Sequence, residues 1–272
     1  VIIDTSNKIT KDNLKTRISL PLNKDELYVL SQNINNLLDR VENAIEREKQ
    51  FTSDASHELR TPLAVMKGTM EVLIRKPRDQ KEYEEKINFC ITEVDRLNHM
   101  VDQLLLLARF ENQKQNIKNE TIYLNAIILD NLTRFSSKIE NKKLKVNTEF
   151  SEDFYIQSDN YLVSIVISNL ISNAIKYSNK NGEININLVN NNNQISFSIA
   201  DKGIGISPVD IDKIFNSFYR SDVTNHAEIK GTGLGLSIVK RLCDLLKLEI
   251  AVESKLNQGT TFILSFPLAK LK

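Results

Sequence analysis

The segment FTSDASHELRTPLAVMKG, residues 51–68, lies within a long stretch of helical periodicity. Phe51, Ala55 and Leu59 recur every four residues and predict the buried stripe of a helix. His57 lies two residues from both Ala55 and Leu59, which places it ~200° around the helix from them. We therefore expect the imidazole of His57 to face solvent.

Three neighbours of His57 give this segment a chemical character. Glu58 could hold the proton of one ring nitrogen and leave the other with a lone pair for nucleophilic attack. Thr61 lies one turn further on the same face, where it could position a water molecule or a phosphoryl group. Pro62 lacks the amide hydrogen that would bond the Glu58 carbonyl, so the helix can bend there. Taken alone, a histidine at this position is more often an ordinary surface residue, and the three neighbours are what favour a chemical role.

The helical periodicity extends on both sides of this segment. From Asp25 to Ile45 the apolar positions step by three and four, which is typical of a coiled coil. RKPRDQ, residues 75–80, predicts a turn, and a second helix of the same kind follows up to Ala108. Two such helices predict an antiparallel hairpin. One hairpin cannot bury both apolar stripes, so we expect two copies of the chain to form a four-helix bundle, as a homodimer.

A different domain is expected after the polar segment 111–120, which we interpret as a linker. Helical patterns cover residues 124–140, 161–177, 211–218 and 235–247, and alternating patterns cover 183–190, 194–201, 249–254 and 260–268. The asparagine-rich residues 190–193 predict a hairpin loop. Short connections between strands, with helices grouped apart, predict a mostly antiparallel sheet covered on one face, an α/β sandwich.

Composition argues against several functions. The chain has 272 residues and a net charge of +1, so it lacks the basic field that attracts nucleic acid. Cys90 and Cys243 both lie in apolar helical patterns, and we expect two reduced core residues of a cytosolic protein without disulfide or metal. No apolar run approaches the ~18 residues that span a bilayer. No signal-peptide pattern opens the chain.

Two glycine-rich turns are candidates for nucleotide binding, although the chain has no G-x-x-x-x-G-K-[ST] pattern. DKGIGI, residues 201–206, puts Asp201 at a strand end, with Gly203 and Gly205 permitting close approach to a flat ligand. GTGLGLSIVK, residues 231–240, precedes a helix whose free amides and dipole attract phosphate. Its three glycines are Gly231, Gly233 and Gly235. Each turn alone could be an ordinary loop.

NLISNAIKYS, residues 169–178, puts Asn169 and Asn173 one turn apart on a helix, with Lys176 and Tyr177 a turn beyond. Amide oxygens suit a hard cation such as Mg²⁺, which keeps phosphates and waters in its coordination shell. Two solvated asparagines in an asparagine-rich chain are the alternative interpretation of this stretch alone.

Residues 51–68 resemble the phosphoacceptor box of sensor histidine kinases of two-component systems. The order NLISNAIKYS, DKGIGI, IFNSFYRSD and GTGLGLSIVK is similar to the N, G1, F and G2 boxes of the same family, which has an ATP-binding domain of the GHKL type. The resemblance implies an ATP-dependent protein-histidine kinase with His57 as phosphoacceptor and Glu58 as general base. It further implies a response regulator as partner, whose aspartate receives the phosphoryl group and whose dephosphorylation Thr61 assists.

The resemblance also implies roles in nucleotide binding. Asp201 would accept a hydrogen bond from the adenine amino group, Asn173 would hold Mg²⁺, and Arg220 would lie near the γ-phosphate. The other implied ATP-binding residues are Asn169, Lys176, Tyr177, Gly203, Gly205, Gly231, Gly233 and Gly235. The polar segment 221–230 is expected to be a mobile lid. His99 and His226 are expected to be ordinary surface residues.

The N-terminal part is similar to the connector and second helix of a HAMP signal-relay module. This similarity implies that the chain is the cytoplasmic portion of a membrane sensor, with contact to the inner or plasma membrane only through a missing N-terminal part. The expected domains are a HAMP-like segment at 1–44, a dimerisation and phosphotransfer hairpin at 45–112 and a catalytic ATP-binding domain at 113–272.

Two other functions remain open from the sequence. One is a nonenzymatic ATP-binding dimeric relay. The other is an ATPase of the gyrase and Hsp90 kind, which shares the nucleotide fold. Those ATPases place a water-activating glutamate one turn before the Mg²⁺ asparagine, and this chain has Asn169 at that position.

Overall fold

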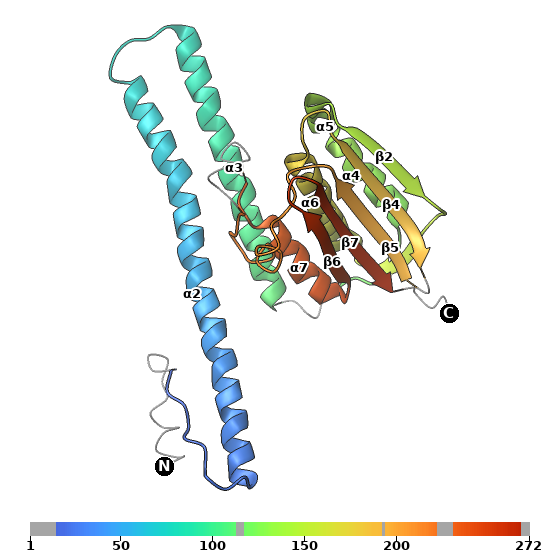
Figure 1. Cartoon of the computed structure of the whole chain (residues 1–272). Coiled ribbons are helices and arrows are strands. Elements are labelled where there is room, and N and C mark those ends of the chain that lie inside the picture. The colour runs from blue at the N-terminus through green and yellow to red at the C-terminus, as the bar shows by residue number, and fades with distance from the viewer. Residues whose placement is uncertain (1–14, 113–116, 192–193, 222–230, 268–272) are drawn as a thin grey trace. The chain divides into compact units, whose positions relative to one another are not determined.

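The computed structural model describes residues 15–112, 117–191, 194–221 and 231–267. The chain divides into two compact units, Val1–Ile74 and Arg75–Lys272, and most of their elements are labelled in Figure 1. The first unit is dominated by one long helix, and the second holds another long helix followed by strands and shorter helices. Among the described residues, no helix combines the length and the apolar character needed to cross a bilayer.

Helix α2, Glu26–Leu73, is the main element of the first unit and has 48 residues. Asp25 is its N-cap, because the carboxylate accepts hydrogen bonds from the backbone N–H groups of Leu27 and Tyr28. The helix continues through Pro62, which is buried, and ends where the sequence predicted a turn. The first predicted helix is therefore confirmed, and it is not interrupted at the proline.

The segment before α2 is bound to that helix. The side-chain amide of Asn35 accepts a hydrogen bond from the N–H of Ile18 at 2.8 Å and donates one to its carbonyl at 2.9 Å. Ile18 is buried, and the Arg17 guanidinium donates to the Asp39 carboxylate at 2.8 Å. These contacts hold residues 15–25, which we call the connector, at one register along α2.

Helix α3, Gln80–Asn112, begins the second unit and confirms the second predicted long helix. The Asp79 carboxylate accepts a hydrogen bond from the N–H of Glu82 at 2.7 Å and so caps the first turn. The helix extends into the predicted linker at 111–120, and strand β1 already begins at Glu120. The linker is therefore shorter than the polarity of this segment predicted.

A five-stranded sheet forms one layer of the sandwich, in the order β2-β4-β5-β7-β6. Its strands are β2 (Lys145–Phe150), β4 (Glu183–Asn191), β5 (Gln194–Asp201), β6 (Glu249–Lys255) and β7 (Gly259–Pro267). Strands β2 and β4 pair in parallel and the other neighbours pair antiparallel, so the mostly antiparallel sheet is confirmed. Strands β1 (Glu120–Tyr123) and β3 (Tyr155–Ser158) form a separate antiparallel pair.

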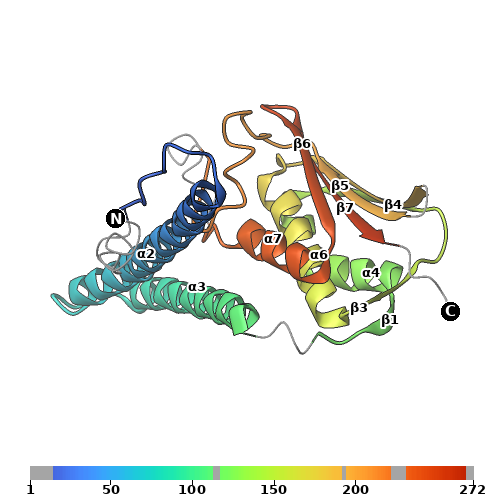
Figure 2. The same ribbon diagram turned by 90° about the horizontal axis from the view of Figure 1, so that it is seen from below.

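Helices form the other layer. They are α4 (Leu124–Arg134), α5 (Ser136–Lys142), α6 (Asn160–Tyr177) and α7 (Gly235–Leu246). Figure 2 shows α4, α6 and α7 on one face of the sheet. Ile186 and Phe197 on the strands and Leu170 on α6 are fully buried between the layers. Each such side chain contributes about 1.5–3 kcal/mol of burial free energy. The predicted α/β sandwich is therefore confirmed.

Residues 211–218, predicted to be helical, form a series of turns. Most of their backbone hydrogen bonds join residues three apart, such as Asn216 N–H to Lys213 O at 2.9 Å. Phe218 has a φ of 62°, and its N–H bonds to the Gly233 carbonyl at 2.9 Å. The helix prediction is wrong here because a bond to a distant loop replaces the last helical bond. Strands β1, β2 and β3 were not predicted, since their alternating patterns are short and mostly polar.

Candidate functional site

Two adjoining cavities lie beside α6 in the second unit. The larger has a volume of about 950 Å³ and the smaller about 100 Å³, and Asn173 and Tyr177 line both. All but one of the residues that the sequence assigned to ATP binding in this unit border these cavities. They are Asn169, Asn173, Lys176, Tyr177, Asp201, Gly205, Arg220, Gly231, Gly233 and Gly235. The exception, Gly203, does not border either cavity, but its backbone N–H donates to the Asp201 carboxylate.

The smaller cavity combines apolar walls with one buried carboxylate. Asp201 is the last residue of β5, is 7% exposed, and accepts a hydrogen bond from the Gly203 N–H at 2.9 Å. Burial raises the pKa of its carboxyl group to about 6. The walls come from Ile204, Ile206, Ile214, Leu236, Leu256 and Phe262. Such a site can hold a flat ring and accept a hydrogen bond from an amino group on its edge.

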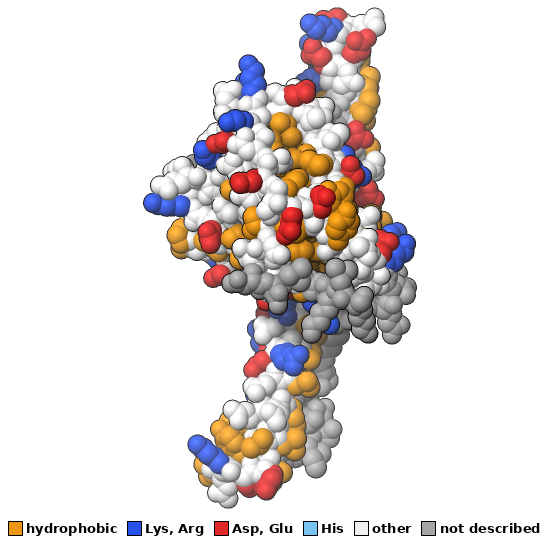
Figure 3. All heavy atoms as spheres, turned by 90° about the vertical axis from the view of Figure 1, so that its right-hand side faces the viewer, with side chains coloured by type: hydrophobic (Ala, Val, Ile, Leu, Met, Phe, Trp, Pro, Cys, Tyr) orange, Lys and Arg blue, Asp and Glu red, His pale blue; other side chains and the backbone are white. Residues whose placement is uncertain are grey.

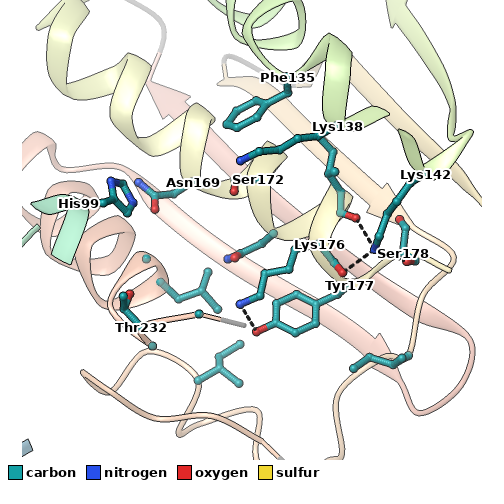
Figure 4. A pocket seen from close by; sticks show the side chains of 18 of the residues that line it. His99, Phe135, Lys138, Lys142, Asn169, Ser172, Lys176, Tyr177, Ser178 and Thr232 are labelled. Carbon is teal, nitrogen blue, oxygen red and sulfur yellow. Dashed lines mark hydrogen bonds between the residues drawn. The ribbon is translucent and has the colours of Figure 1, made fainter. Parts of the chain in front are cut away.

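The larger cavity is lined by polar and basic groups (Figure 4). The Nζ of Lys176 donates to the Tyr177 hydroxyl at 3.1 Å and lies 4.7 Å from the centre of that ring. Burial, then the positive charges of Arg220 and Arg96, lowers the pKa of Lys176 to about 8. An anion entering this cavity would relieve that repulsion, so the cavity favours phosphate groups.

The loop at residues 231–235 passes close to the other parts of the site. Gly233 has a φ of 73°, and an added Cβ would lie 2.7 Å from the Phe218 Cα. A Cβ on Gly235 would lie 2.8 Å from the Asn169 Oδ1, and one on Gly231 would overlap the Lys176 Nζ. Side chains at these positions would therefore displace the residues that line the cavities.

The turn that carries Arg220 is held by one carboxylate. The Tyr219 hydroxyl donates to Asp210 Oδ1 at 2.6 Å, and the Ser221 hydroxyl donates to Asp210 Oδ2. These hydrogen bonds hold the pKa of Asp210 below its ordinary value. Both neighbours of Arg220 are thus anchored, and Arg220 lines the smaller cavity. The remainder of the predicted lid, 222–230, which includes His226, lies outside the described residues.

The candidate catalytic residues His57, Glu58 and Thr61 lie within about one helical turn of α2, in the first unit. His57 is exposed, as the sequence predicted, and Thr61 is also exposed. The Thr61 hydroxyl donates to the His57 carbonyl at 3.1 Å. Within the described part of the chain, no hydrogen bond joins the His57 ring to Glu58. This fits neighbouring side chains that diverge by about 100° around a helix.

Several residues of the larger cavity were missed from the sequence. Arg96, His99 and Gln103 come from α3, and Gln103 accepts a hydrogen bond from the Thr232 hydroxyl at 2.9 Å. His99, expected to be an ordinary surface residue, lines this cavity (Figure 4). Lys138 and Lys142 come from α5, where their spacing of four residues was the available signal.

Two family models match the chain. Residues 47–113 match the His Kinase A (phospho-acceptor) domain, and residues 158–270 match the histidine kinase-, DNA gyrase B- and HSP90-like ATPase. Curated relatives include the signal transduction histidine-protein kinase ArlS of Staphylococcus aureus (strain USA300), which is 32% identical over 281 residues. The match covers 97% of this chain, which spans only 59% of the relative's length.

Solved structures share the fold. The Acinetobacter baumannii histidine kinase AdeS has a TM-score of 0.64 and 25% identity, covering 79% of this chain and 98% of its own. The histidine kinase ThkA, solved in complex with the response regulator protein TrrA, has a TM-score of 0.68 and 23% identity. That match covers 85% of this chain and 66% of ThkA. At this identity the ThkA likeness concerns the fold.

Proposed function

The chain belongs to the sensor histidine kinases of two-component systems, and from that premise we propose that it is an ATP-dependent protein-histidine kinase. One observation carries the proposal. The unit with the Asp201 and Lys176 cavities matches the family's ATPase model, and the exposed His57 lies within the phosphoacceptor match.

The chemistry of the two cavities supports ATP as the ligand. The adenine ring would occupy the smaller cavity, with its amino group donating to Asp201, while the phosphates would enter the larger one beside Lys176. Arg220 lines the smaller cavity, but its charge acts on Lys176 in the larger one, so it would offset charge on the γ-phosphate from the boundary between them. Asn169 and the glycines Gly203, Gly205, Gly231, Gly233 and Gly235 would shape the site around the nucleotide.

Mg²⁺ is the proposed second cofactor, with Asn173 as its ligand. Asn173 lines both cavities and so lies between the proposed sites of the base and the phosphates. The described residues contain no group of three or more His, Cys, Asp or Glu side chains that could hold a metal ion. The protein would therefore supply one amide oxygen and the phosphates and water the remaining ligands, as is usual for Mg²⁺. The bound cation would neutralise charge on the phosphates during transfer.

His57 is the proposed phosphoacceptor. One ring nitrogen forms a bond to the γ-phosphorus while the bond from that phosphorus to the ADP oxygen breaks. Glu58 is the proposed general base for the proton on the other ring nitrogen. The phosphoryl group then passes to an aspartate of a response regulator, the kind of partner found with ThkA, whose fold the chain shares. Exposure of His57 supports this sequence of events, because two different domains must reach it in turn.

We further propose that α2 and α3 form the hairpin expected from the sequence and that two chains pair as a homodimer. Apolar side chains of the predicted seam remain exposed in the single chain, including Leu30, Leu37 and Met70 on α2 and Ile87 and Ile91 on α3. Figure 3 shows hydrophobic side chains exposed along the N-terminal part of α2, at the bottom of the view. A second copy would bury these residues in a four-helix bundle.

The proposed organisation keeps the boundaries expected from the sequence. These are a HAMP-like segment at 1–44, a phosphotransfer hairpin at 45–112 and a catalytic domain at 113–272. The chain would be the cytoplasmic portion of a membrane sensor. The connector contacts on α2 support a relay segment before the phosphotransfer hairpin.

Incubation of the full chain with γ-labelled ATP and Mg²⁺ tests the proposal. A kinase should acquire label that is acid-labile and alkali-stable, as expected for phosphohistidine. Release of labelled phosphate without protein label would favour the ATPase alternative. Nucleotide binding with neither label nor release would favour the nonenzymatic relay.

Thr61→Ala tests the proposed phosphatase activity toward the response regulator. We expect partner dephosphorylation to slow by at least about tenfold, since a group that positions water contributes on the order of 10²-fold. Autophosphorylation should remain within about twofold of wild type, because Thr61 does not border the nucleotide cavities. Both rates are measured on one preparation with purified response regulator. Equal loss of both would reject this role for Thr61.

Nucleotide affinity should depend on pH through Asp201. The carboxylate is the proposed acceptor for the adenine amino group, so its contribution to ADP affinity should be constant well above pH 6 and should be lost below it. In the ligand-free protein, the Asp201 carboxyl group should have the opposite effect, on folding stability. Its pKa is raised from 3.8 to about 6 on folding, so its contribution to stability grows as pH falls from 6 towards 4.

Isothermal titration and thermal melting between pH 5 and 8 check both trends. Asp201→Asn is the control, since it retains the phosphate titration of ADP and loses that of the carboxyl group. Identical pH profiles for the two proteins would contradict the assignment.

A further inference from the structure

The C-terminal end of α6 needs hydrogen-bond donors from outside the helix. The last carbonyl groups of any helix lack partners within it, and α6 ends at Tyr177, inside the proposed phosphate site. The Ala174 carbonyl accepts from the backbone N–H of Ser178 at 3.0 Å and from the Ser178 hydroxyl at 2.7 Å. The Tyr177 carbonyl accepts from the Ile204 N–H at 3.3 Å.

One lysine side chain supplies the remaining donors. The Nζ of Lys142 donates to the carbonyls of Ile175, Lys176 and Ser178 at 3.0, 2.8 and 3.0 Å. Figure 4 shows this side chain reaching the end of α6 from α5. An ammonium group has three N–H donors, so all three are committed to carbonyl oxygens. The positive charge also lies at the negative end of the helix dipole.

The backbone of Lys142 contributes to the same junction. Its carbonyl accepts a hydrogen bond from the N–H of Asn181 at 2.9 Å, in the turn that follows α6. Burial lowers the pKa of the Lys142 ammonium, in agreement with a charge drawn out of solvent by its carbonyl partners. Lys142 therefore fixes both the last turn of α6 and the chain that leaves it.

We propose that Lys142 is a positioning residue for nucleotide binding, which acts by capping the helix end that carries Lys176 and Tyr177. The inference rests on the proposed function. Lys142 lines the larger cavity, yet its donors face carbonyl oxygens and not the cavity, so it serves the site through α6. Without the cap, three carbonyls lose a charged donor and the last turn of α6 frays, which frees the Lys176 side chain from its place in the cavity.

Lys138 provides a matched control on the same helix. It lies one turn before Lys142, also lines the larger cavity, and places its Nζ 5.3 Å from the centre of the Phe135 ring. Lys138→Met and Lys142→Met each remove one positive charge from the cavity wall. Only Lys142→Met removes the donors to α6. A loss of ADP affinity common to both variants gives the effect of removing one positive charge from the cavity wall. A further loss in Lys142→Met gives the effect of removing the cap on α6.

The experiment uses the full chain with both variants and two measurements. Hydrogen exchange without nucleotide should show the amides of residues 176–178 exchanging at least about tenfold faster in Lys142→Met and unchanged in Lys138→Met, as expected for lost charge-assisted hydrogen bonds. ADP titration should show an affinity loss in Lys142→Met about tenfold beyond that in Lys138→Met. If Lys142→Met lowers protection across the whole sheet, Lys142→Gln replaces it. Because Gln keeps two N–H donors and loses the charge, its effects on exchange and affinity should lie between those of Lys138→Met and Lys142→Met.

Chemical rescue distinguishes positioning from general support of the fold. In Lys142→Ala, ammonium or methylammonium ions should restore part of the ADP affinity by binding the three carbonyls. Tetramethylammonium, which has no N–H donor, should restore none. Equal affinities in Lys142→Met and Lys138→Met, or exchange unchanged at residues 176–178, would overturn the proposal. A wild-type chain that binds no ADP would contradict the proposed function, whereas the exchange comparison would still decide the cap.

Discussion

His57→Gln is expected to reduce protein labelling by γ-labelled ATP to background. Glutamine keeps a polar side chain of moderate length on the exposed face of α2 and lacks the ring nitrogen that would attack phosphorus. His57 is the one phosphoacceptor proposed among the described residues, so label on the variant should be undetectable. The measurement is acid-labile, alkali-stable label per chain after a fixed incubation with Mg²⁺ and ATP.

Ser56→Ala is the matched control for this variant. Ser56 is an exposed neighbour of His57, and its hydroxyl only donates to the Thr52 carbonyl at 2.9 Å. Labelling in Ser56→Ala should remain close to wild type. ADP affinity should be unchanged in both variants, because neither residue borders the nucleotide cavities. Normal labelling of His57→Gln would place the acceptor elsewhere and remove the basis of the proposed mechanism.

Gly203→Ala is expected to lower ADP affinity strongly, although it adds a single methyl group. An added Cβ would overlap the Tyr177 carbonyl oxygen and lie 2.7 Å from the Asp201 Oδ1. The oxygen belongs to the backbone at the end of α6, where Gly203 forms a bridge with Ser178, so it cannot simply rotate away. Overpacking of this kind costs ~1–3 kcal/mol, which corresponds to a loss of ADP affinity of roughly 5- to 150-fold.

Gly68→Ala serves as the comparison for Gly203→Ala. No atom lies within 4 Å of a Cβ added at Gly68, which is inside α2. The added methyl should stabilise the helix by about 0.5–1 kcal/mol and leave ADP affinity unchanged. Titration calorimetry and thermal melting separate the two outcomes. Wild-type ADP affinity in Gly203→Ala would show that the 201–206 turn does not form part of the nucleotide site.

Most of the fold could be predicted from the sequence because its strongest signals are periodic. The apolar steps along α2 and α3 and the alternation in β4 and β5 each repeat over many residues, and these elements formed as predicted. The polar strands β1 and β2 carry little alternation, and their pairing partners lie far away in the sequence. The turns at 211–218 depend on Gly233, which no local pattern reveals.

The residues of the candidate site also differ in how far the sequence predicts them. Asp201 and the glycine turns follow strands or precede helices, so their position on an element could be inferred directly. The capping contact of Lys142 could not be inferred, because its three acceptors lie more than thirty residues away and are backbone atoms. The buried environment that moves the pKa values of Asp201 and Lys176 likewise arises only when α6, β5 and the glycine loop come together.

The paired hydrogen bonds between Asn35 and Ile18 fix the connector to the first part of α2 at two points of one residue. A pull on the connector cannot slide it along the helix unless both bonds break together, so the displacement passes to α2 itself. The helix is unbroken from there to His57, ~33 Å further along at 1.5 Å per residue. A push or twist applied at the connector is therefore expected to reach His57, the proposed phosphoacceptor, through one continuous helix.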